Sequence, residues 1–187
     1  DKRAYLVSQD GSELIQIPKY LGGQALLIRR AALQDLRGIH EAHMRSIQEV
    51  CSKDHSKEEI NAWGNRPYRE DMRLYSLRMH FVWAVEDQGA IEGFAEYKTT
   101  DLNGEKIANI QSFYLTKKVL GQSLGKALMN EMLEHMKELK LKTVILESTI
   151  TAQPFYKKMG FSETGAMTNR EVNGTPIRCF PMKKDLQ

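Results

Sequence analysis

The amino-acid sequence predicts a mixed α/β (α+β) domain, with a sheet that begins as an antiparallel meander and ends in a parallel strand–helix–strand core. Three short apolar runs between residues 81 and 115 are separated by turn signals, which indicates the meander. A helical pattern over residues 124–139 then leads to another apolar run at 143–147, which is typical of a crossover between parallel strands. The length of 187 residues, with 41% hydrophobic and 27% charged side chains, is ordinary for one globular domain.

Residues 1–24 are predicted to be an N-terminal extension, and residues 25–187 the domain itself. Apolar runs at 5–7 and 14–17 flank the turn signal Asp10-Gly11, which is typical of a small hairpin. A proline and a glycine pair follow, as in a linker.

The next segment is predicted to contain one strand and two helical regions. Residues 25–30 form an apolar run with the length of a strand. Asp35 opens a helix whose apolar side chains recur at helical spacing. The tetrapeptide at 56–59 is typical of a capping box, which predicts a second helix. That helix is expected to break near residues 64–67 and to resume over 68–79.

The remaining elements follow from apolar runs and turn residues. The meander is expected to consist of three strands, at residues 81–86, 90–97 and 107–115. After the crossover, a short helix around 155–158 ends at Gly160, a residue that suits a helix C-terminus. Two final strands, at 161–166 and 176–182, are predicted to be joined by the Asn173-Gly174 turn.

The composition excludes several classes of protein. The 27 basic side chains exceed the 24 acidic ones by only three, too few for a typical nucleic-acid binder. The apolar runs are far shorter than the roughly 18 residues of a membrane span, and no signal peptide is recognisable. Cys51 and Cys179 are too few for a disulfide framework or a metal site. We therefore expect a cytoplasmic monomer or homodimer with buried thiols and without metal, nucleic-acid or membrane partners.

A glycine-bearing loop joins the last meander strand to the long helix. Gly121 and Gly125 lie in this loop, where small residues let the backbone approach a ligand. The free N–H groups at the start of a helix favour an anion, and a pyrophosphate is the anion we expect here. Glycines that serve only the geometry of the turn are the alternative, because a short glycine pattern has low specificity.

A more specific motif follows the next strand. It is formed by Ala152, Phe155, Tyr156, Gly160 and Phe161. Together with the loop, this segment resembles the GNAT N-acetyltransferase superfamily. That family has an Arg/Gln-x-x-Gly-x-Gly/Ala loop between strand and helix, and a second motif that ends in Ala-x-x-Phe-Tyr-x-x-x-Gly-Phe. The order of elements from residue 25 to 182 also fits, so the resemblance covers most of the chain.

The loop departs from the family pattern in one register. When Gly125 is aligned with the last position, Leu120 stands where the family has Arg or Gln, and Ser123 replaces the middle glycine. A register that starts at Gln122 and ends at Ala127 also satisfies the pattern. Since the family uses backbone N–H groups here and Ser123 still donates one, we expect binding to be retained.

The resemblance implies that acetyl-CoA binds in a cleft where the strands at 107–115 and 143–147 splay apart. The pantetheine arm and the acetyl carbonyl would be held by backbone groups near Tyr114, Leu115 and Thr116. The pyrophosphate would be held by N–H groups of Gln122, Ser123, Leu124, Gly125 and Lys126. Ala152 and Phe155 of the second motif complete the expected cofactor-binding set.

Tyr156 is the expected general acid, because in the family this hydroxyl faces the CoA sulfur. A phenol of pKa about 10 can protonate a thiolate whose acid has a pKa of about 8.5. A tyrosine packed in the core, with its hydroxyl bound to a backbone group, is the alternative.

The sequence indicates the general base less clearly than the general acid. The family often places a carboxylate on the strand before the loop, where this chain has Asn109. Glu96 and Glu147 are the carboxylates expected to reach the cleft. Two alternatives stay open: each side chain is merely exposed or salt-bridged, or a water relay replaces a single base.

These observations predict an acetyl-CoA-dependent N-acetyltransferase that passes the acetyl group directly to an amine. Direct transfer is expected because the thioester is already activated and neither cysteine is close to either motif in the sequence. A non-catalytic acyl-CoA-binding or regulatory module is the alternative, and a nucleotide-binding α/β protein ranks lower because the chain lacks the phosphate-loop motifs. The acceptor is open between small-molecule and peptide amines. Four arginines could either bind an acidic acceptor or form a solvated face of the protein: Arg66, Arg69, Arg73 and Arg78.

Overall fold

The computed structural model describes residues 5–7, 13–16, 26–121 and 123–186. The strands in these ranges are β1 Tyr5–Val7, β2 Glu13–Gln16, β3 Leu26–Arg30, β4 Phe81–Asp87, β5 Ala90–Leu102, β6 Glu105–Leu115, β7 Thr143–Thr149, β8 Ser162–Glu163, β9 Thr168–Val172 and β10 Thr175–Asp185. The α-helices are α1 Leu36–Glu49, α2 Lys57–Gly64, α3 Glu70–Met79, α4 Leu124–Glu138 and α5 Gln153–Lys158. The short 3₁₀ helices are η1 Leu33–Asp35, η2 Cys51–Lys53 and η3 Lys117–Val119.

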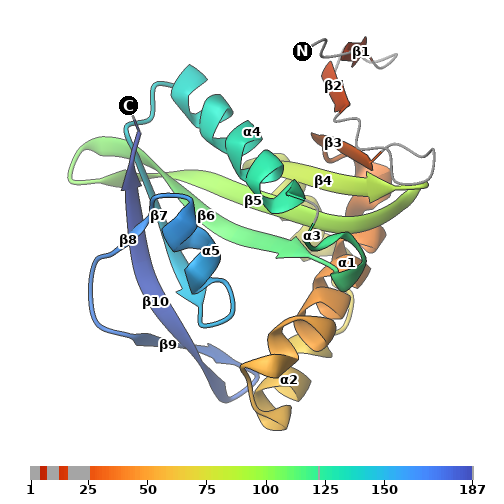
Figure 1. Ribbon diagram of the computed structural model, residues 1–187, viewed down its shortest axis with the longest axis vertical. Coiled ribbons are helices and arrows are strands. Elements are labelled where there is room, and N and C mark those ends of the chain that lie inside the picture. The colour runs from red at the N-terminus through yellow and green to blue at the C-terminus, as the bar shows by residue number, and fades with distance from the viewer. Residues whose placement is uncertain (1–4, 8–12, 17–25, 122, 187) are drawn as a thin grey trace.

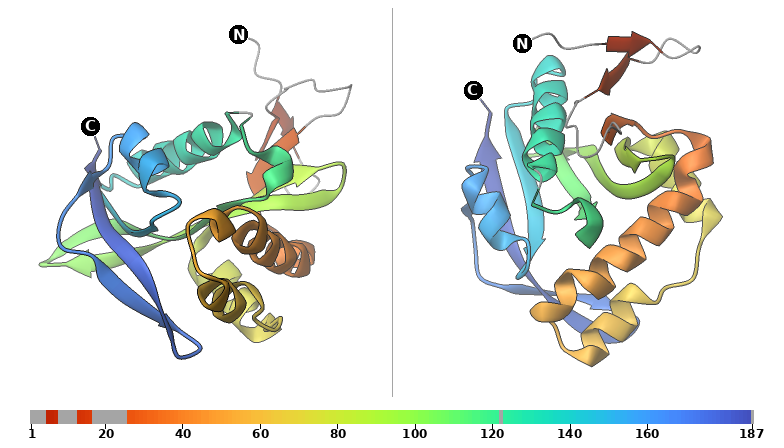
Figure 2. Two further views of the ribbon diagram at one scale, coloured as in Figure 1. Left: turned by 60° about the horizontal axis from the view of Figure 1, so that its bottom comes forward. Right: turned by 45° about the vertical axis from the view of Figure 1, so that its right-hand side comes forward.

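Within these residues the strands form one mixed sheet in the order β1-β2-β3-β4-β5-β6-β7-β10-β8, with β9 beside β10. The pair β6 and β7 is parallel, and the other neighbouring pairs are antiparallel. The predicted fold class is confirmed, because β4, β5 and β6 form the meander and α4 provides the crossover. One face of the sheet is covered by α4 and α5, and the other by α1, α2 and α3 (Figures 1 and 2).

Each face of the sheet has its own hydrophobic core. On the α4 side, buried methionines and leucines of the helix, among them Leu128 and Met132, pack against Tyr97 and Ile110 of the sheet. On the α1 side, Ile39 and Ala42 pack against the meander. The apolar positions predicted from helical spacing therefore do bury the inner faces of both helices.

The N-terminal residues add strands to the sheet edge. β1 pairs antiparallel with β2, and β2 pairs with β3. The predicted turn at Asp10-Gly11 and the linker lie outside the described residues. The division of the chain at residue 24 stays a prediction.

The predicted capping box is present at the start of α2. Ser56 Oγ accepts the N–H of Glu59 at 3.1 Å, and the Glu59 carboxylate accepts the N–H of Ser56 at 2.7 Å. The helix ends at Gly64, as predicted, and α3 begins at Glu70, slightly later than the expected residue 68.

The predicted C-terminal hairpin is wrong in one of its strands. The expected strand at 161–166 is reduced to β8, and the partner of β10 across the Asn173-Gly174 turn is β9. Both turn residues have positive φ, 48° and 78°, which is the geometry of a two-residue hairpin turn. Such a turn joins strands that flank it directly, so the partner strand has to end at Val172.

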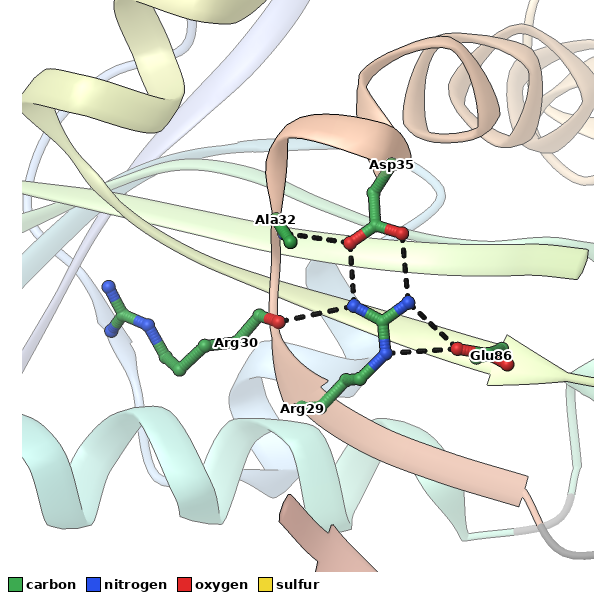
Figure 3. Close-up of polar contacts among 5 residues, drawn as sticks. All are labelled: Arg29, Arg30, Ala32, Asp35 and Glu86. Atoms are coloured by element: carbon green, nitrogen blue, oxygen red, sulfur yellow. Dashed lines mark hydrogen bonds and ion pairs between the residues drawn. The ribbon is translucent and has the colours of Figure 1, made fainter. Parts of the chain in front are cut away.

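An ion network ties β3 to β4 and to the start of the first helical region (Figure 3). Arg29 binds Asp35 through both ends of its guanidinium, at 2.6 and 2.8 Å, and Glu86 at 2.7 and 2.9 Å. Asp35 was expected to open the helix, and it does precede α1. However, its carboxylate accepts the N–H of Ala32 at 2.7 Å and caps no helical N–H. The two carboxylates raise the pKa of Arg29, which keeps its charge fixed.

The parallel strands β6 and β7 separate along their length. Their pairing is confined to residues 108–110 of β6 and 144–146 of β7. Beyond Ile110, β6 continues along β5, and β7 continues along β10. The register between β5 and β6 shifts at the same place and leaves Gln111 as an extra residue. Such a β-bulge bends a strand, so the splay predicted for these strands is present and has a local cause.

Candidate active site

A cleft of about 550 Å³ opens where β6 and β7 separate. One wall is formed by the loop before α4 and by α5, and the other by the end of α1 and by η2. Past Ile110, β7 does not pair with β6, so β6 borders the cleft with an edge that no other described strand pairs with on that side. Such an edge is suited to an extended ligand that pairs with backbone groups.

Most of the predicted cofactor-binding residues lie around this cleft. It is lined by Tyr114, Leu115, Ser123, Gly125, Lys126, Ala152 and Phe155. Thr116 does not line it, since its N–H donates to Glu92 O at 2.8 Å and its hydroxyl to the Glu92 carboxylate at 2.6 Å. The Leu124 side chain is buried in the core, and Gln122 lies outside the described residues.

The start of α4 is arranged to accept an anion. Among the described residues, the first bond of this helix runs from Ala127 N–H to Ser123 O, and the N–H groups of residues 124–126 have no acceptor there. Together with the helix dipole, these groups favour a phosphate, and the exposed Lys126 adds a positive charge.

The backbone favours one of the two loop registers. Ser123 has φ 61° and ψ 8°, in the left-handed region that favours glycine. A glycine would adopt this conformation without strain, so position 123 corresponds to the middle glycine of the family pattern. This supports the register in which Leu120 stands in the Arg/Gln position. The left-handed serine costs about 1–2 kcal/mol.

Gly125 brings the two motif segments together. A Cβ at this position would lie 3.2 Å from Cε2 of Phe155. Glycine therefore allows the ring of α5 to pack directly against the first turn of α4, and both contact the cleft.

Tyr156 is buried beneath the cleft and lines it. Its ring packs between Phe113, Phe155 and Phe161, at centroid distances of 6.3, 5.5 and 5.6 Å. Within the described residues the hydroxyl has no hydrogen-bond partner. Burial, together with the neighbouring Tyr114, raises the pKa of Tyr156. The phenol therefore carries its proton at neutral pH, which is the state that a general acid needs.

The two candidate bases lie in different places. Glu147 is exposed and lines the cleft, with Thr168 Oγ1 at 3.4 Å from its carboxylate. Glu96 is buried on the α1 face of the sheet, where its carboxylate bonds Nδ1 of His80. It lines a small cavity beneath α1 and α3 and not the main cleft.

Cys51 lies closer to the motifs than its sequence position indicated. It lines the cleft together with Ala152 and Tyr156, because η2 follows α1 directly and turns into the gap. Burial raises the pKa of Cys51 to about 11, so the thiol is protonated and a poor nucleophile at neutral pH. Cys51 and Cys179 are both free and buried, as expected.

Sequence reasoning did not identify which residues at the end of α1 line the cleft. Ser46 and Val50 line it, and Ser46 Oγ donates to Leu115 O at 2.8 Å. The available signal was a serine on the apolar face of an amphipathic helix, where a buried hydroxyl requires a partner.

A splayed parallel pair, with a helix N-terminus on one side and a buried tyrosine beside it, defines an acetyltransferase of the GNAT type. The chain belongs to this family: the family described as acetyltransferase (GNAT) domain matches residues 51–186, more than half of its length.

Solved structures show the same fold. A GCN5-related N-acetyltransferase from Rhodopseudomonas palustris is 19% identical, with a TM-score of 0.74 over 85% of this chain and 94% of that one. The PaiA N-acetyltransferase from Thermoplasma acidophilum, solved with coenzyme A, is 20% identical, with a TM-score of 0.65 over 86% and 98%. A GNAT-family acetyltransferase from Streptococcus pneumoniae is 19% identical, with a TM-score of 0.65 over 87% and 99%.

No helix in the described part of the chain is long and apolar enough to cross a membrane.

Proposed function

We infer that this protein is an acetyl-CoA-dependent N-acetyltransferase that passes the acetyl group directly to an amine. The observation that carries this proposal is the cleft between β6 and β7, which has unpaired N–H groups of α4 at one end and the protonated Tyr156 in its wall. Its volume of about 550 Å³ is within the usual range of ligand sites. A neighbour of the same fold was solved with coenzyme A, which supports the choice of ligand.

The residues divide the chemistry between them. The N–H groups of residues 124–126 bind the pyrophosphate, and the free edge of β6 holds the pantetheine arm and orients the thioester. The amine nitrogen attacks the acetyl carbonyl, the carbon–sulfur bond breaks, and Tyr156 gives its proton to the departing thiolate. Glu147, directly or through one water, takes the proton that the amine loses and then releases it to solvent, and solvent restores the Tyr156 proton.

A non-catalytic acyl-CoA-binding module is the second candidate. Leu120, which stands in the Arg/Gln position, and Asn109, where the family often has a carboxylate, favour it. Release of free CoA that depends on an added amine separates the two candidates.

Acetyl-CoA is expected to raise the melting temperature. A ligand that binds only the folded state adds about 2.7 kcal/mol at 100 times its Kd, which is several degrees for a chain of this size. Differential scanning fluorimetry with acetyl-CoA, ATP and NAD measures this. No shift at millimolar acetyl-CoA contradicts the cofactor assignment.

The variant Gly125→Glu is expected to weaken this binding. It places a carboxylate at the pyrophosphate position and pushes on the Phe155 ring, whose Cε2 would lie 3.2 Å from the new Cβ. We expect the Kd to rise by roughly 5–150-fold, which corresponds to about 1–3 kcal/mol. Asn130→Glu, at an exposed position of α4 away from the cleft, is the matched control and should bind normally. Unchanged affinity in a folded Gly125→Glu protein would place the phosphates elsewhere.

Cys51→Ala is expected to leave kcat nearly unchanged, because a thiol with a pKa of about 11 does not form an acetyl-enzyme at neutral pH. Removal of a true nucleophile would instead cost on the order of 10⁶ in kcat. Steady-state CoA release, compared at equal fractions of folded protein, distinguishes direct transfer from a covalent route.

A further inference from the structure

Three arginines gather on the α1 face of the sheet, and we name them the arginine cluster: Arg66, Arg73 and Arg170. Nη2 of Arg73 lies 2.8 Å from Nδ1 of His43, and Nη2 of Arg66 lies 3.4 Å from Nε2 of the same ring. Arg170, on β9, is the cross-strand partner of Ile177, which packs against Trp63 on this face. Its charge lowers the pKa of both His43 and Arg66. Segments far apart in the sequence therefore bring their positive charges to one place.

The cluster adjoins the cleft through a single ring. Tyr114 lines the cleft, and its ring centroid lies 4.1 Å from that of His43. The charges of Arg66 and Arg170 also act on Tyr114. The three arginines do not line the cleft themselves: they lie behind Tyr114 on the α1 side of the sheet, whereas Tyr156 lines the cleft from the α4 side.

The cluster has no directly bonded counter-ion in the described part of the chain, where none of its arginines forms an ion pair with a carboxylate. The nearest acidic group is Glu96, which lines the same small cavity as Arg73. Glu96 acts on Arg73 at longer range, but its carboxylate is bonded to His80. Burial lowers the pKa of both Arg66 and Arg73, so these guanidinium groups have lost water without gaining a counter-ion. Such a loss is unfavourable unless a ligand supplies the negative charge.

His43 cannot satisfy both neighbours. Burial and the charges of Arg73 and Arg66 lower its pKa well below the usual value, so the ring is neutral and has one acceptor nitrogen. The shorter contact assigns that acceptor to Nδ1, which receives the N–H of Arg73. Nε2 then carries a proton that faces the N–H of Arg66, and this pair of donors lacks an acceptor.

We propose that the acceptor is an amine that also carries an oxyanion group, a carboxylate or a phosphate, which the arginine cluster binds while the nitrogen reaches the thioester. This rests on the proposed function. Both oxyanions fit the guanidinium fork and would accept the unmatched donors of Arg66 and His43. Polyamines and other purely cationic amines would be repelled by the same charges.

The test compares matched amines that differ in one group: an aminocarboxylate, the corresponding aminophosphonate, and the neutral amide of the aminocarboxylate. Affinity for the protein saturated with CoA is measured by calorimetry, and kcat/KM by release of free CoA. We expect both acidic compounds, or one of them, to exceed the amide by about 10–100-fold in affinity, as expected for hydrogen bonds to charged groups. The stronger of the two identifies the oxyanion.

Two variants locate the effect. Arg73→Met is expected to abolish the preference for acidic amines and to keep the acetyl-CoA melting shift, which shows that the fold and the cofactor site are intact. Arg78→Met, an exposed arginine of the same helix, should keep the preference. Equal affinity for the acidic amines and the amide overturns this inference, whether or not CoA is released. Binding of acidic amines without any CoA release instead overturns the proposed function and leaves the binding inference standing.

Discussion

Replacing Tyr156 with phenylalanine is expected to lower kcat by about 10²–10⁴, with the lower end favoured because water partly replaces the lost hydroxyl. The ring stays in its contacts with Phe113, Phe155 and Phe161, so packing is retained. The Kd of acetyl-CoA should change by less than about tenfold, because protonation of the thiolate is needed only in the transition state. Steady-state kinetics and calorimetry on both proteins measure the two effects.

Tyr97→Phe is the matched control for this variant. Tyr97 is also buried, but it lies outside the cleft, and its hydroxyl bonds Nδ1 of His135 at 2.7 Å. Losing that bond should lower the melting temperature and leave kcat of the folded protein unchanged. The opposite pattern for Tyr156, a lower melting temperature with full kcat, would show a packed tyrosine with no part in the mechanism.

Replacing Arg29 with methionine is expected to reduce the free energy of unfolding by about 3–5 kcal/mol, the usual result of removing one partner of a buried ion pair. The side chains of Arg29, Asp35 and Glu86 are 14%, 5% and 22% exposed. Without the guanidinium, two carboxylates in little-exposed positions face each other with no shared cation. The connection between β3, β4 and α1 would weaken with them.

Urea denaturation measures this difference, with Arg178→Met as the control at an exposed position of β10. That control should change stability by less than about 0.5 kcal/mol. A loss below about 1 kcal/mol for Arg29→Met would mean that solvent screens the network as it does an ordinary surface pair.

Local patterns were sufficient for much of this fold. Ser56 caps α2 through contacts between residues three apart, and the motif around Tyr156 lies within the short segment between β7 and β8. Such features depend on neighbours in the sequence. The strand at 168–172 was missed because its residues are mostly exposed, so no apolar alternation marks it. The position of this strand is set instead by the Asn173-Gly174 turn, whose residues have the positive φ values of a two-residue hairpin turn.

The site was less accessible to sequence reasoning because its parts come from distant segments. Cys51 and Ala152 lie far apart in the sequence, and both line the cleft because η2 follows directly from the end of α1. Glu96 has the residue type of a base, but its burial beside His80 depends on how α3 ends. The arginine cluster likewise requires the connection after α2, the helix α3 and the strand β9 to converge, which no spacing in the sequence indicates.

The extra residue on β6 has a consequence for how this chain tolerates change. Ile110, Phe113 and Leu115 all face the α4 side, although strict alternation from Ile110 would turn Tyr114 to that side instead. Gln111 thus exchanges odd and even positions halfway along the strand. Loss of this one residue would restore regular alternation, so Phe113 and Tyr114 would keep their present sides, but the bend that separates β6 from β7 would be lost. A length change at the Asn103-Gly104 turn of the same hairpin would alter only an exposed loop. The cleft between β6 and β7 therefore depends on the number of residues in this strand as well as on the identity of its side chains.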